Sequence, residues 1–188
     1  MKRVVDVVLS LIALLLLSPL LLAVAAAIAL HDGLPVFFRQ QRVGLRGREF
    51  GMFKFRSMVK NAASIGPYFT VAQDSRITPV GRLIRRTSLD ELPQLINVLL
   101  GDMSLVGPRP DVMAQRGQYS DAQWQERCSV RPGITGLAQA LLRSECTEAD
   151  RCDMDLRYVR QTGGLPGLWL DFKIMFWTLG RLAGKGSN

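Results

Sequence analysis

The feature of this sequence that most restricts its fold is an apolar run near the N-terminus. Residues Val7–Leu30 are interrupted only by Ser10, Ser18 and Pro19. As an unbroken helix this run would extend about 36 Å, which is enough to cross a bilayer core of about 30 Å. A cleaved signal peptide, a straight transmembrane helix and a re-entrant hairpin are the three structures to be weighed for it.

The charges that flank the apolar run help to separate these structures. Lys2 and Arg3 precede it, and many basic residues follow it within residues 39–60, where Glu49 is the only acid. The length of the run and the basic residues directly after it argue against export as a signal peptide. Because basic flanks stay on the cytoplasmic side of a membrane, we expect both ends of the run there.

The position of Pro19, almost at the midpoint of the run, favours the re-entrant structure. Proline removes a backbone donor and clashes with the carbonyl four residues earlier, so it kinks or breaks a helix. The hydroxyl of Ser18 can bond to the backbone group that is freed. We therefore expect residues 1–34 to form a re-entrant membrane helix-break-helix. We prefer this structure to a transmembrane helix that is kinked at Pro19.

Residues 35–188 are numerous enough for one cytosolic core. Residues 1–34 contain two basic and two acidic residues, so the rest of the chain keeps the whole net charge of +8. Arginine dominates the basic residues, and its fork of donors suits phosphate oxygens. With one histidine, His31, and no C-x-x-C pair, the chain offers little for a catalytic triad or a zinc site. Nucleic acid is a poor candidate partner, because no recognition motif is present.

Local patterns predict an α+β fold that is rich in helices. Residues 35–58 have the pattern of a β-hairpin that turns at residues 44–47. Packing on the face of Phe53 and Phe55 would point Lys54 and Arg56 outward together; an ordinary basic strand face has the same pattern.

Three helices are expected after the hairpin. Residues 80–86 form a short one, and a second carries apolar residues at helical spacing from residue 92 to the glycine stop at Gly101. Residues 168–182 predict an apolar helix with Asp171 and Thr178 as its only polar stripe. Such a helix is either buried or lies in a membrane interface.

Two adjacent acids, Asp90 and Glu91, form the most informative local motif. Ser88 and Glu91 fit a capping box, so one interpretation of the acids is that they only begin a helix. The other is chemical: a helix N-terminus keeps a carboxylate ionised, as a nucleophile or a metal ligand. Because neighbouring helical residues point about 100° apart, one acid could face a phosphorus atom while the other holds Mg²⁺. Arg85 and Arg109 would then neutralise phosphate charge.

The ordered motifs of the chain resemble those of the bacterial sugar transferase family, the small monotopic phosphoglycosyl transferases. These motifs are Lys2–Asp6, Ser18–Pro19, Gln41–Gly44, Lys54–Met58, Ser88–Gln94, Gly101–Ser104, Gly107–Pro110 and Arg131–Gln139. The chain differs from similar proteins at Leu141-Leu142, where an Asn-Gly pair is frequent, and residues 145–155 are acidic with no function that the sequence assigns.

The resemblance implies a mechanism and a location. Asp90 would attack the β-phosphorus of a UDP-sugar, UMP would leave, and polyprenol phosphate (undecaprenyl phosphate) would take the sugar phosphate from the aspartyl intermediate. Glu91 would bind Mg²⁺ as the metal ligand. Basic residues matching phosphate- or nucleotide-binding positions are Lys54, Arg85, Arg109 and Arg143. The protein would lie among lipids on the cytoplasmic face of the bacterial inner membrane, initiating glycoconjugate synthesis, and a homo-oligomer is compatible with the sequence.

Two other functions stay open at this point. A non-catalytic, membrane-anchored module that binds anionic lipid or a partner would use the same basic surface. A one-step transferase would use Asp90 as a general base, with no covalent intermediate.

Overall fold

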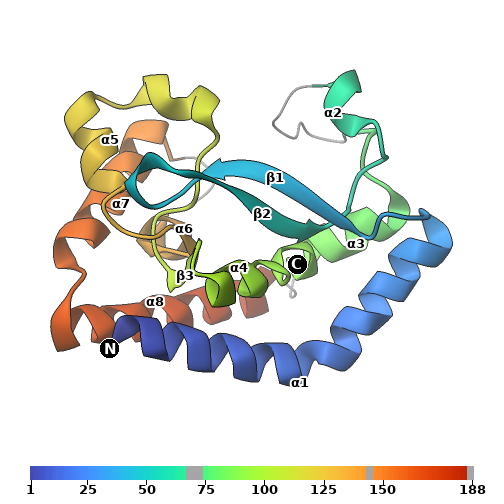
Figure 1. Ribbon diagram of the computed structural model, residues 1–188, viewed down its shortest axis with the longest axis horizontal. Coiled ribbons are helices and arrows are strands. Elements are labelled where there is room, and N and C mark those ends of the chain that lie inside the picture. The colour runs from blue at the N-terminus through green and yellow to red at the C-terminus, as the bar shows by residue number, and fades with distance from the viewer. Residues whose placement is uncertain (67–73, 143–145, 186–188) are drawn as a thin grey trace.

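The computed structural model describes residues 1–66, 74–142 and 146–185. Its elements are α1 (Lys2–His31), β1 (Phe37–Val43), η1 (Leu45–Gly47), β2 (Glu49–Phe55), α2 (Ala62–Ile65), α3 (Pro79–Arg86), η2 (Leu89–Glu91), α4 (Gln94–Leu100), β3 (Ser104–Val106), η3 (Met113–Gln118), α5 (Asp121–Arg127), β4 (Gly133–Thr135), α6 (Leu137–Leu141), α7 (Glu148–Gln161) and α8 (Gly164–Lys185). Many helices surround two small sheets, which confirms the α+β class. In Figure 1 the β1–β2 hairpin crosses the middle of the molecule, with α1 and α8 below it and α2 and α5 above.

Helix α1 is long and apolar enough to cross a membrane, judged by length and composition. It continues through Pro19 as one element, and Figure 1 shows it bent. Ser18 Oγ donates to the carbonyl oxygen of Leu15 at 2.8 Å. A residue with an N–H at position 19 would bond to that carbonyl in a regular helix. The expected break at Ser18–Pro19 is thus a bend, and the two halves stay joined.

Both ends of α1 are bonded to the same folded body. At its N-terminal end, Lys2 Nζ lies 2.6 Å from Oδ2 of Asp171 in α8. At its C-terminal end, the buried guanidinium of Arg56 donates to the carbonyl oxygen of Asp32 at 2.8 Å and to that of Gly33. The apolar middle of the helix therefore projects from the body between two attached ends.

The β-hairpin and its turn lie where the sequence predicts them, with β1 and β2 antiparallel. The expectation that Lys54 and Arg56 point outward together is wrong. Both faces of β2 are covered, since Met52 packs in the cluster around α4 and Phe55 in the cluster around α1. Lys54 consequently extends to Glu91, and Arg56 is buried at the end of α1.

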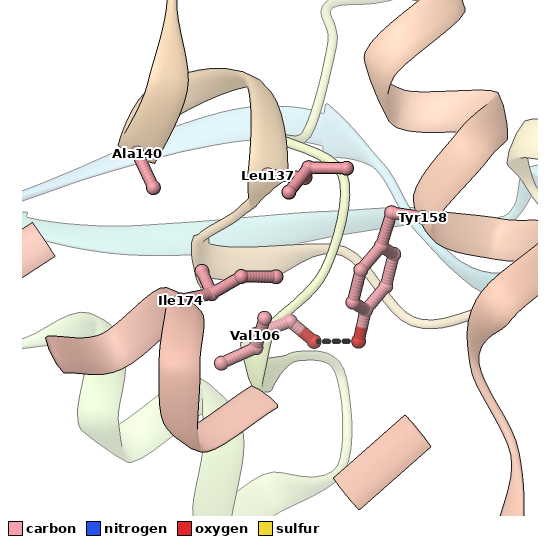
Figure 2. Packing of buried hydrophobic residues seen from close by; sticks show 5 residues of the cluster. All are labelled: Val106, Leu137, Ala140, Tyr158 and Ile174. Atoms are coloured by element: carbon pink, nitrogen blue, oxygen red, sulfur yellow. Dashed lines mark hydrogen bonds between the residues drawn. The ribbon is translucent and has the colours of Figure 1, made fainter. Parts of the chain in front are cut away.

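A second, parallel sheet joins β3 to β4, a segment that the sequence presents only as a turn. Beside it lies the apolar cluster drawn in Figure 2, which joins β3, α6, α7 and α8. Its members are Val106, Leu137, Ala140, Tyr158 and Ile174. The hydroxyl of Tyr158 donates to the carbonyl oxygen of Val106 at 3.0 Å, which ties α7 to β3.

Helix α8 turns its polar stripe inward and its aromatic residues outward. Asp171 is buried, and the hydroxyls of Thr178 and Thr135 lie 2.7 Å apart. Trp169 and Phe176, in contrast, are 63% and 76% exposed. Large aromatic side chains exposed on an apolar helix do not suit water, so this surface of α8 has the character of a membrane interface.

Candidate active site

Asp90 and Glu91 lie on η2, a single 3₁₀ turn between α3 and α4. The expected capping box is wrong. Ser88 has a φ of 57°, in the left-handed region, and makes no side-chain cap bond, whereas an N-cap residue needs an extended backbone. Helix α4 begins after Pro93, at Gln94, which is three residues after Glu91. The acids are thus presented by a tight turn and not by the helix itself.

Two cations from distant parts of the chain meet on one oxygen of Glu91. Lys54 Nζ from β2 lies 2.8 Å from Glu91 Oε1, and Arg109 Nη2 from the loop after β3 lies 2.7 Å from the same atom. The Lys54 and Glu91 side chains are mostly buried, while Arg109 is about half exposed. The exposed cation can therefore also face a ligand in solvent.

The electrostatic environment keeps Glu91 ionised. Burial alone would raise the pKa of Glu91, but the charges and hydrogen bonds of Arg109 and Lys54 outweigh it and lower the pKa to about 2. Burial in turn lowers the pKa of Lys54. Glu91 is thus a permanent anion at neutral pH that orients two cations.

Asp90 has the opposite environment. Its side chain is buried, and burial raises its pKa above the usual value. The charge of Lys54 opposes this shift, that of Glu91 adds to it, and that of Arg85 from α3 opposes it. A carboxylate that is poorly solvated and less stabilised as an anion is a better nucleophile than an exposed one.

The structure therefore brings together Lys54, Arg85 and Arg109 around the Asp90–Glu91 pair, as the motifs led us to expect. Arg143, the fourth basic residue expected there, lies outside the described residues.

Comparison with known proteins identifies the family. A family model described as bacterial sugar transferase matches residues 1–185. This chain belongs to that family. Its relatives include a UDP-glucose:undecaprenyl-phosphate glucose-1-phosphate transferase of Xanthomonas campestris pv. campestris, 44% identical over 98% of this chain and 39% of the relative.

Of two further relatives, one is named for a different sugar and one for the same sugar. A UDP-N-acetylgalactosamine-undecaprenyl-phosphate N-acetylgalactosaminephosphotransferase of Aeromonas hydrophila is 41% identical over 95% of this chain and 42% of its own. A UDP-glucose:undecaprenyl-phosphate glucose-1-phosphate transferase of Caulobacter vibrioides is 43% identical over 95% of this chain and 68% of its own. This sugar transferase chain thus spans about two fifths of the first two relatives and about two thirds of the third.

The donor set of this family member fits Mg²⁺ only together with a phosphate ligand. Within the described residues, no three His, Cys, Asp or Glu side chains gather closely enough to hold a metal ion. Mg²⁺ in phosphate-handling sites uses one or two carboxylates and completes its shell with phosphate oxygens and water. Asp90 and Glu91 supply two such carboxylates, although Oε1 of Glu91 is already bonded to two cations.

Sequence reasoning did not assign a role to Arg42, which the sugar transferase fold places beside this site. Its Nη1 donates to the carbonyl oxygen of Pro110 at 3.0 Å. Burial, followed by the charge of Arg109, lowers the pKa of Arg42, and the charges of Asp111 and Glu91 oppose this. The available signal was its place in the Gln41–Gly44 motif, which the resemblance included without a function.

Proposed function

We propose that this protein transfers a sugar 1-phosphate from a UDP-sugar to a polyprenol phosphate, of the undecaprenyl phosphate class, and releases UMP. The observation that carries the proposal is the pair of acids on η2, one buried and one held by Lys54 and Arg109. The names of the relatives support it, and because they specify different sugars the proposal extends to the donor only as a UDP-sugar.

In the first step, a carboxylate oxygen of Asp90 attacks the β-phosphorus of the UDP-sugar. The bond from that phosphorus to the bridging oxygen breaks, and its electron pair leaves with UMP. The sugar phosphate stays on Asp90 as an acyl phosphate. Burial of Asp90 favours this role, because a carboxylate that water solvates poorly attacks more readily.

In the second step, a phosphate oxygen of the polyprenol phosphate attacks the same phosphorus and releases Asp90. The product is a polyprenyl diphosphate sugar. Charge on the phosphoryl oxygens is redistributed in both steps, and the cations of Lys54, Arg85 and Arg109 would neutralise it. Mg²⁺, held by Glu91 when bound, would supply further positive charge to the diphosphate.

The test measures UMP release by protein in native lipid, over a panel of UDP-sugars with polyprenol phosphate and Mg²⁺. Asp90→Asn should abolish release, and Glu91→Gln should lower it at least about 100-fold, since removal of one electrostatic group of this kind typically costs 10²–10³. Asp153→Asn, which changes an exposed carboxylate on α7, is the matched control. Absence of UMP release with every donor would refute the proposal and favour the non-catalytic module, and full activity of Asp90→Asn would refute the role of Asp90.

A trapping experiment separates the two-step route from direct transfer. Without the acceptor, a radiolabelled sugar phosphate should become attached to Asp90 in the wild type and not in Asp90→Asn. Turnover with no adduct, in repeated trials on active protein, would favour direct transfer with Asp90 as a general base.

We further propose that α1 is re-entrant and that the folded body lies on the cytoplasmic face of the membrane. The contacts of Lys2 at one end of α1 and of Arg56 at the other bind both ends to one body. A spanning helix would separate these ends by the whole bilayer, and buried ion pairs and hydrogen bonds would be lost. The bend in α1, which contains Pro19 near its middle, allows the helix to enter and leave on the same side.

Cysteine labelling tests this topology. A cysteine inserted directly after Met1 and the substitution Gln40→Cys are introduced singly into protein whose three cysteines are replaced by serine. A membrane-impermeant maleimide should label both positions from the cytoplasmic side and neither from the periplasmic side. Labelling of the two positions from opposite sides would refute the re-entrant structure and leave the proposed chemistry standing.

A further inference from the structure

Four consecutive carbonyl groups of the loop that carries Arg109 accept hydrogen bonds from other parts of the chain. Prolines on both sides of Arg109 restrict its backbone and supply no N–H donors. The donors come from β1, α5 and β4: Gly133 N to Pro108 O at 2.9 Å, Arg127 Nη2 to Arg109 O at 2.5 Å, Arg42 Nη1 to Pro110 O at 3.0 Å and Val43 N to Asp111 O at 2.8 Å. The direction of the Arg109 side chain therefore depends on groups that do not belong to the loop.

Arg127, the last residue of α5, makes the bond to Arg109 itself, and its guanidinium is 6% exposed. Its Nη1 lies 2.8 Å from Asp111 Oδ2, and its Nε and Nη2 donate to Asp155 Oδ2 at 3.1 and 2.9 Å. Tyr119 donates to Asp111 Oδ2 at 2.8 Å, and the guanidinium lies 5.4 Å from the Tyr119 ring centre. All three nitrogens of Arg127 are thus bonded within the protein.

The bonds of Arg127 join three separate parts of the chain. Asp111 ends the Arg109 loop, Asp155 belongs to α7, and Arg127 itself belongs to α5. A guanidinium fixes two carboxylates and a carbonyl in one plane, which a more flexible ammonium cannot do. The bonds of Asp155 to Arg127 also give a structural function to one residue of the acidic segment 145–155, for which the sequence assigned none.

We propose that Arg127 is a positioning residue, which holds the Arg109 loop so that the Arg109 guanidinium meets Glu91 and the phosphates of the donor. This inference rests on the proposed function for its effect on catalysis, but its structural part can be tested without activity. Arg109 is half exposed and fixed by one bond to Glu91, so loss of the anchor on its backbone would let it turn into solvent.

The first test measures how fast phenylglyoxal modifies Arg109, with the site located by peptide mass spectrometry. The pairing with Glu91 should protect Arg109 in the wild type. Arg127→Met should accelerate the modification of Arg109 at least about threefold, towards the rate at which Arg109 is modified in Glu91→Gln. The exposed Arg48 should be modified at the same rate in all variants. Arg160→Met is the matched control, because Arg160 also bonds a carboxylate from another helix but is exposed. An unchanged Arg109 rate in Arg127→Met would overturn the inference.

The second test is a double-mutant cycle on kcat/KM for UMP release. Arg127→Met alone should lower this constant about 10- to 100-fold, with a melting temperature that reports any loss of folding. In an Arg109→Met background the same change should lower it less than about threefold, because the group that Arg127 positions is already gone. If Arg127→Met caused only a general structural defect, it would lower kcat/KM by the same factor in the Arg109→Met background as in the wild type. That result would overturn the inference.

The two tests distinguish failure of the inference from failure of the proposed function. Wild-type protein that releases no UMP from any UDP-sugar would refute the function, and the phenylglyoxal rates would still decide whether Arg127 positions Arg109. Active wild type with unchanged rates or with multiplying losses would refute the inference alone.

Discussion

Replacement of Asn97 by alanine tests how the two halves of the active site are held together. Asn97 lies in α4 with no exposed surface, and its side chain bonds to the outer edge of β2. Its Oδ1 accepts from the N–H of Phe53 at 2.8 Å, and its Nδ2 donates to the carbonyl of Gly51 at 2.9 Å. One amide thus replaces a neighbouring strand, and it fixes Lys54, the residue after Phe53, relative to the turn that precedes α4.

Asn97→Ala leaves one backbone donor and one backbone acceptor without their partner. Each such group costs about 1–3 kcal/mol when buried, and the half-buried Phe53 lies at the lower end, so we expect a loss of about 3 kcal/mol. For a chain of this size that lowers the melting temperature by roughly 6–12 °C. Asn97→Asp should not restore stability, because it removes the donor to Gly51 and places a charge beside Asp102, whose Oδ2 now lies 3.3 Å from Nδ2.

Thermal unfolding in detergent or nanodiscs, followed by UMP release at a temperature where both proteins are folded, measures the two consequences of Asn97→Ala. At that temperature UMP release by Asn97→Ala should fall by more than the loss of folded protein explains, because Lys54 is no longer held at a fixed distance from Glu91. Asn61→Ala, at an exposed position, is the control. If Asn97→Ala melts within about 2 °C of that control, the amide does not support β2 and the reasoning is wrong.

Three further predictions concern α1, the site and α8. Ile28→Ala should lower the free energy of unfolding by about 3 kcal/mol because Ile28 is fully buried against the body, whereas Leu30→Ala, at an 88% exposed position, should change it little; equal melting temperatures would contradict the attachment of α1. The pKa of Glu91 is lowered to about 2, so the stability that ionised Glu91 contributes is complete above its unfolded pKa of 4.5 and is lost as the pH falls towards 2. Between pH 7 and 3 the free energy of unfolding of the wild type should therefore fall by roughly 2 kcal/mol more than that of Glu91→Gln in pH-dependent denaturation. Brominated acyl chains should quench the fluorescence of a variant retaining only Trp169 at least twofold more than one retaining only the buried Trp124, and equal quenching would place α8 away from lipid.

The elements that the sequence predicted well are those with local causes. The turn at residues 44–47 is rich in glycine, and α4 ends at Gly101, whose φ of 97° is a conformation that glycine adopts without strain. Apolar spacing then determined the helix between η2 and that stop. These signals lie within a few residues of the structure they determine, so they can be identified without knowledge of the fold.

The errors and omissions arose where distant parts of the chain decide the outcome. Ser88 has the residue type of a cap, but the tight turn from α3 into η2 gives it a left-handed backbone that excludes capping. The pairing of β3 with β4 joins residues about 30 positions apart and has no local signal. The arginine pattern indicated phosphate binding, yet it could not separate Arg109, which faces the site, from Arg127, which is bonded on all sides.

The short helix α4 connects the proposed membrane anchor to the chemistry. Arg3 donates to the carbonyl oxygens of Val98 and Leu99 at the C-terminal end of α4, at 2.6 and 3.1 Å, where a cation also complements the helix dipole. The acids lie directly before the other end of the same helix. Seven residues of helix extend about 10 Å, which separates the Arg3 contacts from the acids. Because Arg3 lies at the start of α1, this one short helix sets the distance between the start of the proposed re-entrant helix and the proposed nucleophile Asp90.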